Sequence, residues 1–324
     1  MITPVAFIIF NRPAETARVF AAIAAARPQR LLIVADGPRP NREGEAELCA
    51  ATRAVVSRVD WPCEVQTNFA ATNLGCKERV SSGLTWVFEQ CEEAVILEDD
   101  CLPHPTFFRY CAELLAHYRD DKRVAMISGG NFLHGQQRAP DSYYFSLYGH
   151  IWGWASWRDR WAGYDVGMPR WQELRRTDWL DKLLQDKWAA RGWRGEFDAV
   201  AEGRLNTWDH QWRFAWWAAG QYAIAPSRNL ISNLGFGEAA THTGDLAFAA
   251  TMANLPTQAM EFPLRHPAQI TLDRAAESYI FRQLSPWAVP PKGLQNRLRF
   301  HLADKLPPPL RRALTSFRDK FKAP

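Results

Sequence analysis

Residues 94–100 read Ala-Val-Ile-Leu-Glu-Asp-Asp, so four apolar residues pass directly into three acids. An unbroken apolar run is typical of a parallel-sheet strand covered on both faces, and ligands of open α/β sheets bind beyond the carboxyl ends of such strands. Three carboxylates at such a place need a cation, and hard divalent ions prefer oxygen ligands. The stretch therefore predicts a buried strand that ends at a Mg²⁺ or Mn²⁺ site.

The acids also suggest a ligand. Such ions commonly bind one or two protein carboxylates plus the phosphates of a substrate, so we expect a nucleotide diphosphate. If the chain stays extended, Glu98 and Asp100 lie on one side and Asp99 on the other, and we assign the metal to Asp100. Taken alone, the triplet is explained equally well by an acidic turn, or by a cap for a helix that begins near His104.

Composition limits the class of protein. The chain has 324 residues, of which 47% are hydrophobic, enough for one large domain or two modest ones. Apolar runs such as residues 5–10 are too short to cross a bilayer, and no signal-peptide pattern begins the chain, so we expect a cytoplasmic protein. The six cysteines include no C-x-x-C pair, which favours reduced thiols over zinc or redox sites.

Positive charge is concentrated at the carboxyl end. The net charge is +4, yet nine Lys or Arg residues follow position 291 against only two acids. Within this tail Leu294, Leu298, Leu302 and Leu306 recur every four residues, as on a helix lying on an anionic membrane surface. Packing on the protein's own surface is an equally good interpretation. We expect no nucleic-acid partner.

The first 130 residues alternate strands and helices. Apolar runs predict strands at 5–10, 31–35, 63–69, 94–97 and 124–128, with helices at 13–26, 43–59, 73–90 and 105–118 between them. This alternation predicts an α/β fold with a mostly parallel central sheet flanked by helices.

The pattern after residue 130 is less regular. Twelve of the fifteen tryptophans fall between Trp152 and Trp217. We expect a strand at 143–146 and helices at 154–161, 174–188 and 208–219. A stripe on the last helix (Trp208, Trp212, Trp216) is typical of core packing. Three other tryptophans (152, 154 and 157) offer flat rings on which a sugar could stack.

Polar residues follow each predicted parallel strand. If those strands are neighbours, Arg12, Asp36, residues 73–77 and the acids at 98–100 meet at one edge of the sheet. Arg12 suits a phosphate or a base, and Asp36 a base or ribose. An Asp-Gly turn explains Asp36 equally well, and a solvated helix start explains Lys77 better. No G-x-G-x-x-G, Walker A, H-E-x-x-H or G-x-S-x-G motif occurs.

Seven short motifs together carry a family resemblance. They are Asn11-Arg12-Pro13, Ala35-Asp36-Gly37, Asn73-Leu74-Gly75-Cys76-Lys77, Leu97-Glu98-Asp99-Asp100-Cys101, Ile151-Trp152-Gly153-Trp154, Thr207-Trp208-Asp209, and Asn233-Leu234-Gly235-Phe236-Gly237 with Ala240-Thr241-His242-Thr243. In this order they resemble bacterial glycosyltransferases of the GT-A fold (family 2-like). Their layout is also similar to that of the Golgi N-acetylglucosaminyltransferase that opens complex N-glycan synthesis. The resemblance spans about residues 4–245.

The resemblance implies a donor, a metal and an acceptor. The donor would be a nucleotide-diphosphate sugar, with UDP favoured, and Mn²⁺ or Mg²⁺ would bind the last acid of a D-x-D-like motif, here Asp100. Glu98 and Asp99 would contact ribose or sugar hydroxyls, while Arg12 and Asp36 would hold the nucleoside. Lys77 would join the donor site. The acceptor would be a bacterial surface glycan or a lipid-linked glycan.

The family resemblance also divides the chain into three parts. Residues 1–130 would form the nucleotide-sugar-binding half, residues 131–255 the Trp-rich acceptor-binding and catalytic half, and residues 256–324 a carboxyl-terminal extension with the basic tail. The protein would work in the cytoplasm, with the inner face of the plasma membrane as its peripheral location if the tail binds lipid.

A catalytic base follows from the same resemblance. The Golgi enzyme has Trp-Asp-Asp-Trp where this chain has Trp208-Asp209-His210-Gln211-Trp212. Only one acid remains, so we assign the base of an inverting transfer to Asp209 and expect its pKa to be somewhat raised in an apolar setting. His210 as base, or Asp209 as a helix cap, are the alternatives.

The glycine-flanked loop 233–243 is expected to order over the diphosphate, with His242 contacting metal or phosphate. A surface loop histidine is the other interpretation of His242.

Two rival functions remain. A sugar-phosphate nucleotidyltransferase would use the same sheet and carboxylates, but it normally shows a glycine-rich Lys/Arg signature after its first strand, which this chain lacks. A catalytically silent carbohydrate-binding scaffold would keep the Trp-rich half without turnover.

Overall fold

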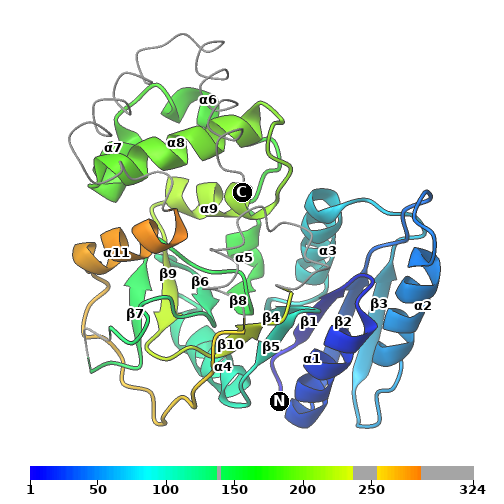
Figure 1. Ribbon diagram of the computed structural model, residues 1–324. Coiled ribbons are helices and arrows are strands. Elements are labelled where there is room, and N and C mark those ends of the chain that lie inside the picture. The colour runs from blue at the N-terminus through cyan, green and yellow to red at the C-terminus, as the bar shows by residue number, and fades with distance from the viewer. Residues whose placement is uncertain (137–139, 236–253, 286–324) are drawn as a thin grey trace, which may run out of the picture.

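The computed structural model describes residues 1–136, 140–235 and 254–285. Its centre is an eight-stranded sheet in the order β3-β2-β1-β4-β8-β6-β9-β7, flanked by helices (Figure 1). The strands of this sheet are β1 (Val5–Ile9), β2 (Arg30–Ala35), β3 (Glu64–Phe69), β4 (Glu93–Glu98), β6 (Val124–Ser128), β7 (Tyr143–Ser146), β8 (Trp154–Trp157) and β9 (Tyr222–Pro226). A separate two-stranded sheet pairs β5 (Cys101–Pro103) with β10 (Ile231–Asn233).

The helices follow the expected alternation in the first half. They are α1 (Pro13–Ala26), α2 (Glu45–Val56), α3 (Cys76–Gln90), α4 (Thr106–Tyr118), α5 (Arg158–Trp161), α6 (Trp171–Leu174), α7 (Trp179–Leu184), α8 (Lys187–Ala201), α9 (Asp209–Ala218) and α11 (Arg274–Leu284). Strands β3, β2, β1 and β4 are mutually parallel. The predicted α/β fold with a mostly parallel central sheet is confirmed.

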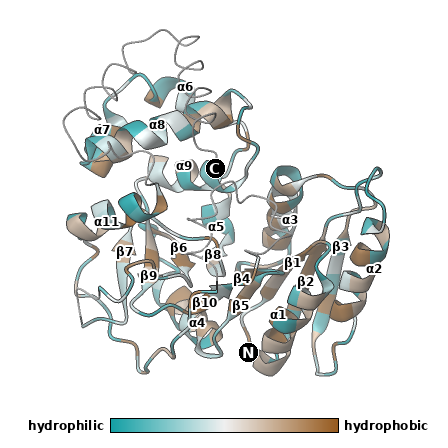
Figure 2. Ribbon diagram, in the orientation of Figure 1, coloured by the Kyte–Doolittle hydropathy of each residue, from teal (hydrophilic) through white to brown (hydrophobic). Residues whose placement is uncertain are grey.

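Alternate residues of the parallel strands enter two cores, one on each face of the sheet. In β1, Val5, Phe7 and Ile9 join the core formed with α1 and α4, whereas Ala6 and Ile8 join the core formed with α3 and the helices of the second half. Both faces are therefore covered, which is why these strands appear in the sequence as unbroken apolar runs. Figure 2 shows this apolar character along the central strands.

Two elements of the second half differ from prediction. Residues 154–161, expected to be a helix, form β8 and then α5, and β8 lies antiparallel between β4 and β6. All four residues of β8 are buried, so no alternation marked it as a strand.

The predicted helix 174–188 is three separate helices, α6 to α8. Gln185 has a left-handed backbone (φ 52°) that ends α7, and the Asp186 side chain then accepts hydrogen bonds from the N–H groups of Trp188 and Ala189 to begin α8. Asp186, a residue type that commonly caps helices, is the sequence signal that marks the start of a new helix here.

The tryptophans mainly build the core. Trp208, Trp212 and Trp216 are buried, as the stripe predicted. The idea of a sugar-stacking surface is wrong for Trp154 and Trp157, which are 0% and 2% exposed. Trp152 is half-buried and packs edge-on against Phe132, with ring centroids 5.4 Å apart.

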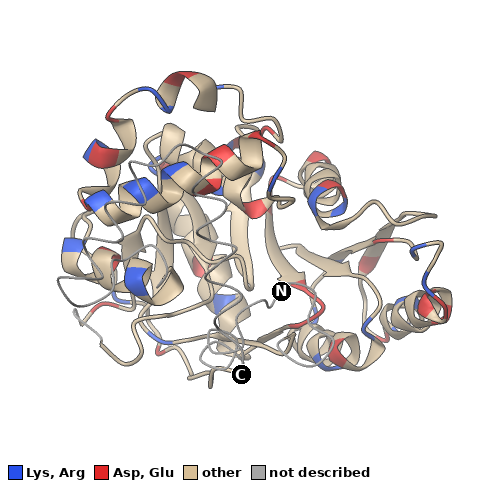
Figure 3. Ribbon diagram, turned by 45° about the horizontal axis from the view of Figure 1, so that its top comes forward, with Lys and Arg blue, Asp and Glu red and all other residues tan. Residues whose placement is uncertain are grey.

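Part of the predicted extension packs firmly on the sheet. Helix α11 places Glu277 inside the protein, where its carboxylate accepts hydrogen bonds from Ser146 Oγ at 2.6 Å and Leu147 N at 2.7 Å. Ile280 and Phe281 on the same helix are buried. The basic tail after residue 291 lies outside the described residues. Charges of both signs are interspersed over the helices of the described part (Figure 3).

No helix among the described residues is both long enough and apolar enough to cross a bilayer.

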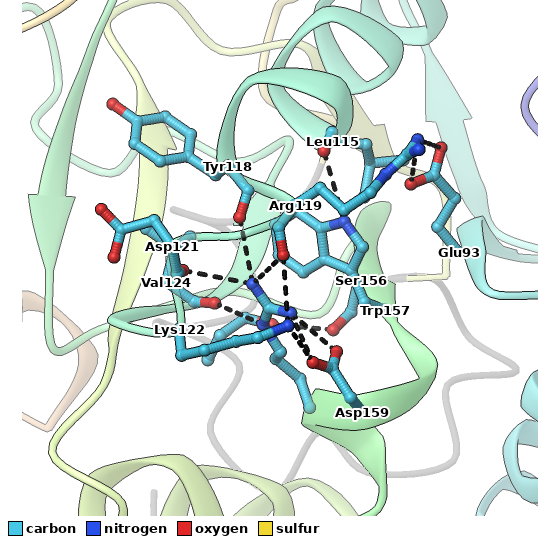
Figure 4. A network of polar contacts seen from close by, with 12 residues as sticks. Glu93, Leu115, Tyr118, Arg119, Asp121, Lys122, Val124, Ser156, Trp157 and Asp159 are labelled. Carbon is cyan, nitrogen blue, oxygen red and sulfur yellow. Dashed lines mark hydrogen bonds and ion pairs between the residues drawn. The ribbon is translucent and has the colours of Figure 1, made fainter.

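A buried arginine fixes the amino-terminal side of the sheet. Arg160, whose side chain is 2% exposed, donates to the carbonyls of Tyr118 at 3.0 Å, Arg119 at 2.8 Å, Asp121 at 3.1 Å and Val124 at 3.1 Å. These groups belong to the polar network of Figure 4, in which Arg119 also pairs with Glu93 at 2.9 Å. One side chain thus holds the end of α4 to the start of β6.

Replacing Arg160 with Met should lower the free energy of unfolding by about 3 kcal/mol or more, because each buried carbonyl left without a partner costs about 1–3 kcal/mol. Urea denaturation measures this loss. The control is Arg123→Met, because Arg123 forms an exposed pair with Asp121 and such pairs contribute about 1 kcal/mol or less. Equal losses in the two variants would contradict the prediction.

Candidate active site at the carboxyl ends of the parallel strands

The three acids lie where the sequence predicted, at the end of β4. Glu98 is the last residue of this strand, and Asp99 and Asp100 form the turn into β5. Asp99 is buried, and its Oδ2 accepts a hydrogen bond from the backbone N–H of Phe10 at 2.9 Å. Asp99 thus joins the ends of β1 and β4. Burial and the neighbouring Asp100 raise the pKa of Asp99 to about 7.

Arg12, just after β1, supplies positive charge next to the acids of this turn. Its guanidinium donates to Asp100 Oδ2 at 2.7 Å and lies 3.6 Å from Asp99 Oδ1. Its predicted partner, a nucleoside, remains a prediction, and the structure places Arg12 beside the carboxylate that we assign to the metal.

A segment from the second half covers Asp100. Strand β10 pairs with β5, and the N–H of Leu234 donates to the Asp100 carbonyl at 2.8 Å. The next residue, Gly235, lies so close that a Cβ atom there would be 2.1 Å from Asp100 Oδ2. A side chain at position 235 would therefore have to displace this carboxylate. The rest of the predicted loop, including His242, lies outside the described residues.

Asp209 reaches the same place from the second half. It is the first residue of α9. Burial, Asp100 and Asp99 hold the pKa of Glu98 well above its usual range, and the charge of Asp209 raises it further. The Cys76 thiol at the start of α3 responds to the same groups: burial and then the charges of Glu98 and Asp209 raise its pKa to about 12. Glu98, Asp100, Asp209 and Cys76 thus converge.

The environment of Asp209 differs from prediction. Its Oδ1 accepts hydrogen bonds from Thr207 Oγ1 and, at 3.1 Å, from His210 Nδ1. Although burial opposes it, the positive His210 holds the pKa of Asp209 below its usual range, so the expected raised pKa is wrong. Asp209 makes no side-chain capping bond to α9, so the cap interpretation is wrong as well. Its bonds to described residues all use Oδ1, which leaves Oδ2 for a substrate.

His210 lies between two carboxylates. Its Nε2 is 3.5 Å from Glu196 Oε2, and its ring packs on Trp193 at 5.2 Å. Despite burial, Asp209 and Glu196 raise the pKa of His210 to about 9. A protonated imidazole cannot accept a proton, which weighs against His210 as base at neutral pH. No sequence motif pointed to Glu196, which lies on α8.

Two other predicted residues have structural partners. Both oxygens of Asp36 are used: Oδ1 accepts from the N–H groups of Gly37 at 2.8 Å and Leu74 at 2.9 Å, and Oδ2 from Asn73 Nδ2 at 2.9 Å and Gly75 N at 3.1 Å. Asp36 therefore holds the loop that leads into α3.

Lys77, in the first turn of α3, lies 3.5 Å from Glu78. Neither this pair nor the bonds of Asp36 test the predicted contacts of these two residues with a nucleotide.

The carboxylates suit a divalent cation that also binds substrate oxygens. Burial and then the charges of Asp100 and Asp99 raise the pKa of Glu98, and a nearby cation would favour its ionised form. Within the described ranges, no three His, Cys, Asp or Glu side chains are grouped as a complete metal site. An ion held by Asp100, with Glu98 near, would therefore need further oxygen ligands from a substrate, and this metal remains a prediction.

Gly235→Ala should weaken the binding of UDP with Mn²⁺ by at least about tenfold, or 1.4 kcal/mol, because the new Cβ would displace the Asp100 carboxylate. Titration calorimetry measures this affinity. Gly195→Ala is the control, since a Cβ at Gly195 in α8 meets nothing within 4 Å and Ala favours helix. Unchanged affinity in Gly235→Ala would contradict this role of Gly235.

The imidazole of His210 should titrate near pH 9 when followed by NMR. Because the folded-state pKa exceeds the usual histidine value of 6.5, protonated His210 stabilises the fold fully below about pH 6.5, and this contribution is lost as the pH rises through about 9. Glu196→Gln should lower the pH midpoint of the His210 titration. Glu202→Gln, which removes an exposed partner of Arg204, should not. A wild-type midpoint near 6.5 would contradict the charged pair.

The chain was compared with known families, curated proteins and solved structures, and three of the matching structures are described here. No protein-family model matches the chain. No curated protein matches it either. The chain is similar to the galactosyltransferase LgtC in complex with donor and acceptor sugar analogues, at 12% identity and a TM-score of 0.37, covering 86% of this chain and 95% of that one. It is also similar to UDP-glucose pyrophosphorylase with UDP-glucose (9%, TM-score 0.33) and without ligand (11%, TM-score 0.34), each covering 70% of this chain and 90% of that one.

Proposed function

We propose that this protein is a glycosyltransferase that moves a sugar from a nucleotide-diphosphate sugar to a hydroxyl group, with inversion at the anomeric carbon. The observation that carries the proposal is the place of Asp209: the preceding Trp208 stacks on Trp154, which pairs with Ile96 of β4, and the Asp209 charge acts on Glu98 at the end of that strand. A carboxylate next to the donor edge but borne by another part of the chain is what a base for a separate acceptor requires.

On the donor side, each residue has a role that follows from its place. Arg12 pairs with the diphosphate, next to the carboxylate it already contacts. Glu98 accepts hydrogen bonds from ribose or sugar hydroxyls, and Asp99 ties the turn after β4 to the end of β1. Mn²⁺ or Mg²⁺, when bound at Asp100, would stabilise negative charge on the leaving diphosphate. Lys77 and His242 remain proposed donor contacts.

On the acceptor side, Asp209 takes the proton of the attacking hydroxyl. Its low pKa keeps it ionised, and the bonds from Thr207 and His210 fix its orientation. The hydroxyl becomes acidic only as its oxygen bonds to the anomeric carbon, so a weak but positioned base is sufficient. We further propose that the acceptor is a bacterial surface glycan or lipid-linked glycan, and that the basic tail brings the protein to an anionic membrane.

The proposal is tested with a panel of UDP-sugars, Mn²⁺ and a chelator. Wild type should be stabilised by UDP plus Mn²⁺, because a ligand that binds only the native state raises its stability, and it should turn over at least one UDP-sugar. Asp100→Asn should lose the Mn²⁺-dependent part of both signals. Turnover undiminished in excess chelator would refute the metal role, and the absence of UDP binding would refute the donor site.

Asp209→Asn should lower kcat at least about a hundredfold, or roughly 2.7 kcal/mol of barrier, since a positioned base contributes about 10²–10⁴-fold. Donor affinity should change little, because the amide oxygen can still accept the bond from Thr207, whereas stability should fall with the loss of the charge pair to His210. His210→Gln is the matched variant: it should retain more activity than Asp209→Asn. An active Asp209→Asn beside an inactive His210→Gln would move the base to His210.

A further inference from the structure

A groove lies between α3 and the turn that follows α5. This groove has a volume of about 440 Å³, within the range of small-molecule sites. One wall is a face of α3 and the other is the turn; together they contribute Glu78, Ser81, Ser82, Thr85, Trp86 and Glu89, and Tyr164, Asp165 and Val166. From Glu78 to Glu89 the helix rises roughly 16 Å. The groove is therefore long enough for more than one sugar ring.

Most polar groups of the groove are hydrogen-bond acceptors, and the Tyr164 hydroxyl and the Trp86 indole N–H are the groups that can donate. Three carboxylates line it, and no described Lys, Arg or His does. The hydroxyl hydrogens are already used inside α3: Ser81 donates to Lys77 O at 2.7 Å, Ser82 to Glu78 O at 2.6 Å and Thr85 to Ser81 O at 3.0 Å. Oxygen lone pairs remain for a ligand. Such a surface selects a ligand rich in donors and without negative charge.

Aromatic rings complete this surface. Trp86 is half-buried, packed against the core, and lines the groove with the rest of its indole. Tyr164 is stacked on Trp161 at 4.4 Å and 9°. Trp161 also donates from Nε1 to Thr85 Oγ1 at 3.1 Å. Both walls are thus held rigidly, and their rings suit the apolar faces of pyranoses.

The groove is built on the same aromatic cluster as the proposed base. Trp161 packs against Trp208 and Trp212, with centroids 6.5 and 5.2 Å apart. Trp208 directly precedes Asp209. Tyr164 lies close enough to Asp209 for this carboxylate to contribute to its raised pKa. One end of the groove therefore approaches the place where an acceptor hydroxyl would react.

We infer that this groove binds a neutral oligosaccharide, held by stacking on Trp86 and by hydroxyl donation to the carboxylates and serine and threonine oxygens of its walls. That the bound saccharide is the acceptor of the transfer rests on the proposed function. Anionic saccharides are excluded by the carboxylates of Glu78, Glu89 and Asp165.

The test follows the indole N–H of Trp86 by NMR in the full chain. The neutral probes are cellobiose, maltose and N,N′-diacetylchitobiose, and a hyaluronan-derived disaccharide is the anionic comparator. At least one neutral probe should shift the Trp86 signal saturably, while the anionic probe should bind at least about tenfold more weakly. Failure of all three neutral probes, or preference for the anionic one, would overturn the inference.

Variants of the groove residues test where the saccharide binds. Trp86→Ala should weaken the affinity about tenfold, followed by ligand-observed NMR, whereas Trp86→Phe should recover most of it. Trp179→Ala is the control, because Trp179 is also half-buried but packs on Phe214 away from the groove. If Trp86→Ala does not fold, Ser82→Arg, at an exposed position, fills the groove and should have the same effect. Equal loss in Trp179→Ala, or no loss in the groove variants, would overturn the inference.

Nucleotide binding separates the two proposals. Saccharide binding without stabilisation by UDP and Mn²⁺ would keep the groove and reject the donor site. Stabilisation by UDP and Mn²⁺ without saccharide binding would reject the groove alone.

Discussion

The ion pair between Arg12 and Asp100 is the contact on which the candidate site depends. Three acids follow one another at the end of a buried strand, and their mutual repulsion in a poorly hydrated place is costly. Arg12 reaches them from the end of the neighbouring parallel strand, so the sheet itself brings the compensating charge. Gly235 closes over the pair because it has no side chain. Strand pairing, charge and close approach of the backbone are thus linked at one point.

The second half positions its residues in another way. Its tryptophans form a continuous cluster between the sheet and α9, with Trp154, Trp161, Trp208 and Trp212 in mutual ring contact. Large rings have few rotatable bonds and bury much area, so the start of α9 is held firmly. Asp209 is placed by this packing, and its charge is then set by His210 and Glu196. The abundance of tryptophan therefore serves the geometry of the site more than direct contact with ligand.

Arg213 of α9 links this helix to the segment that follows β7. It donates to the carbonyls of Leu147 at 3.0 Å and Gly149 at 2.8 Å, and its guanidinium lies 4.8 Å from the Trp193 ring centroid. Leu147 also donates to Glu277 of α11. The segment after β7 is thus tied both to the helix that begins with Asp209 and to the helix of the extension. Desolvated polar groups of this kind are costly unless they are paired, so their partners specify how the helices dock.

The sequence by itself determined the parallel half of the fold and its acidic edge. Unbroken apolar strands, a proline at the start of α1 and the acids at 98–100 are local signals, since each depends on neighbours along the chain. Tertiary structure decided the rest. Strand β8 is covered on both faces and so shows no alternation of apolar and polar residues. The Asp186 cap divides a stretch that hydrophobic periodicity had predicted as one helix. The pKa of Asp209 is lowered by the imidazolium of His210, which Glu196 of another helix helps to keep charged. Asp36 shows the same limit: its position was predictable, but the four donors that occupy it come from a loop nearly forty residues away and from its own turn. Charge and hydrogen bonding act through space, and a sequence pattern records only what acts along the chain.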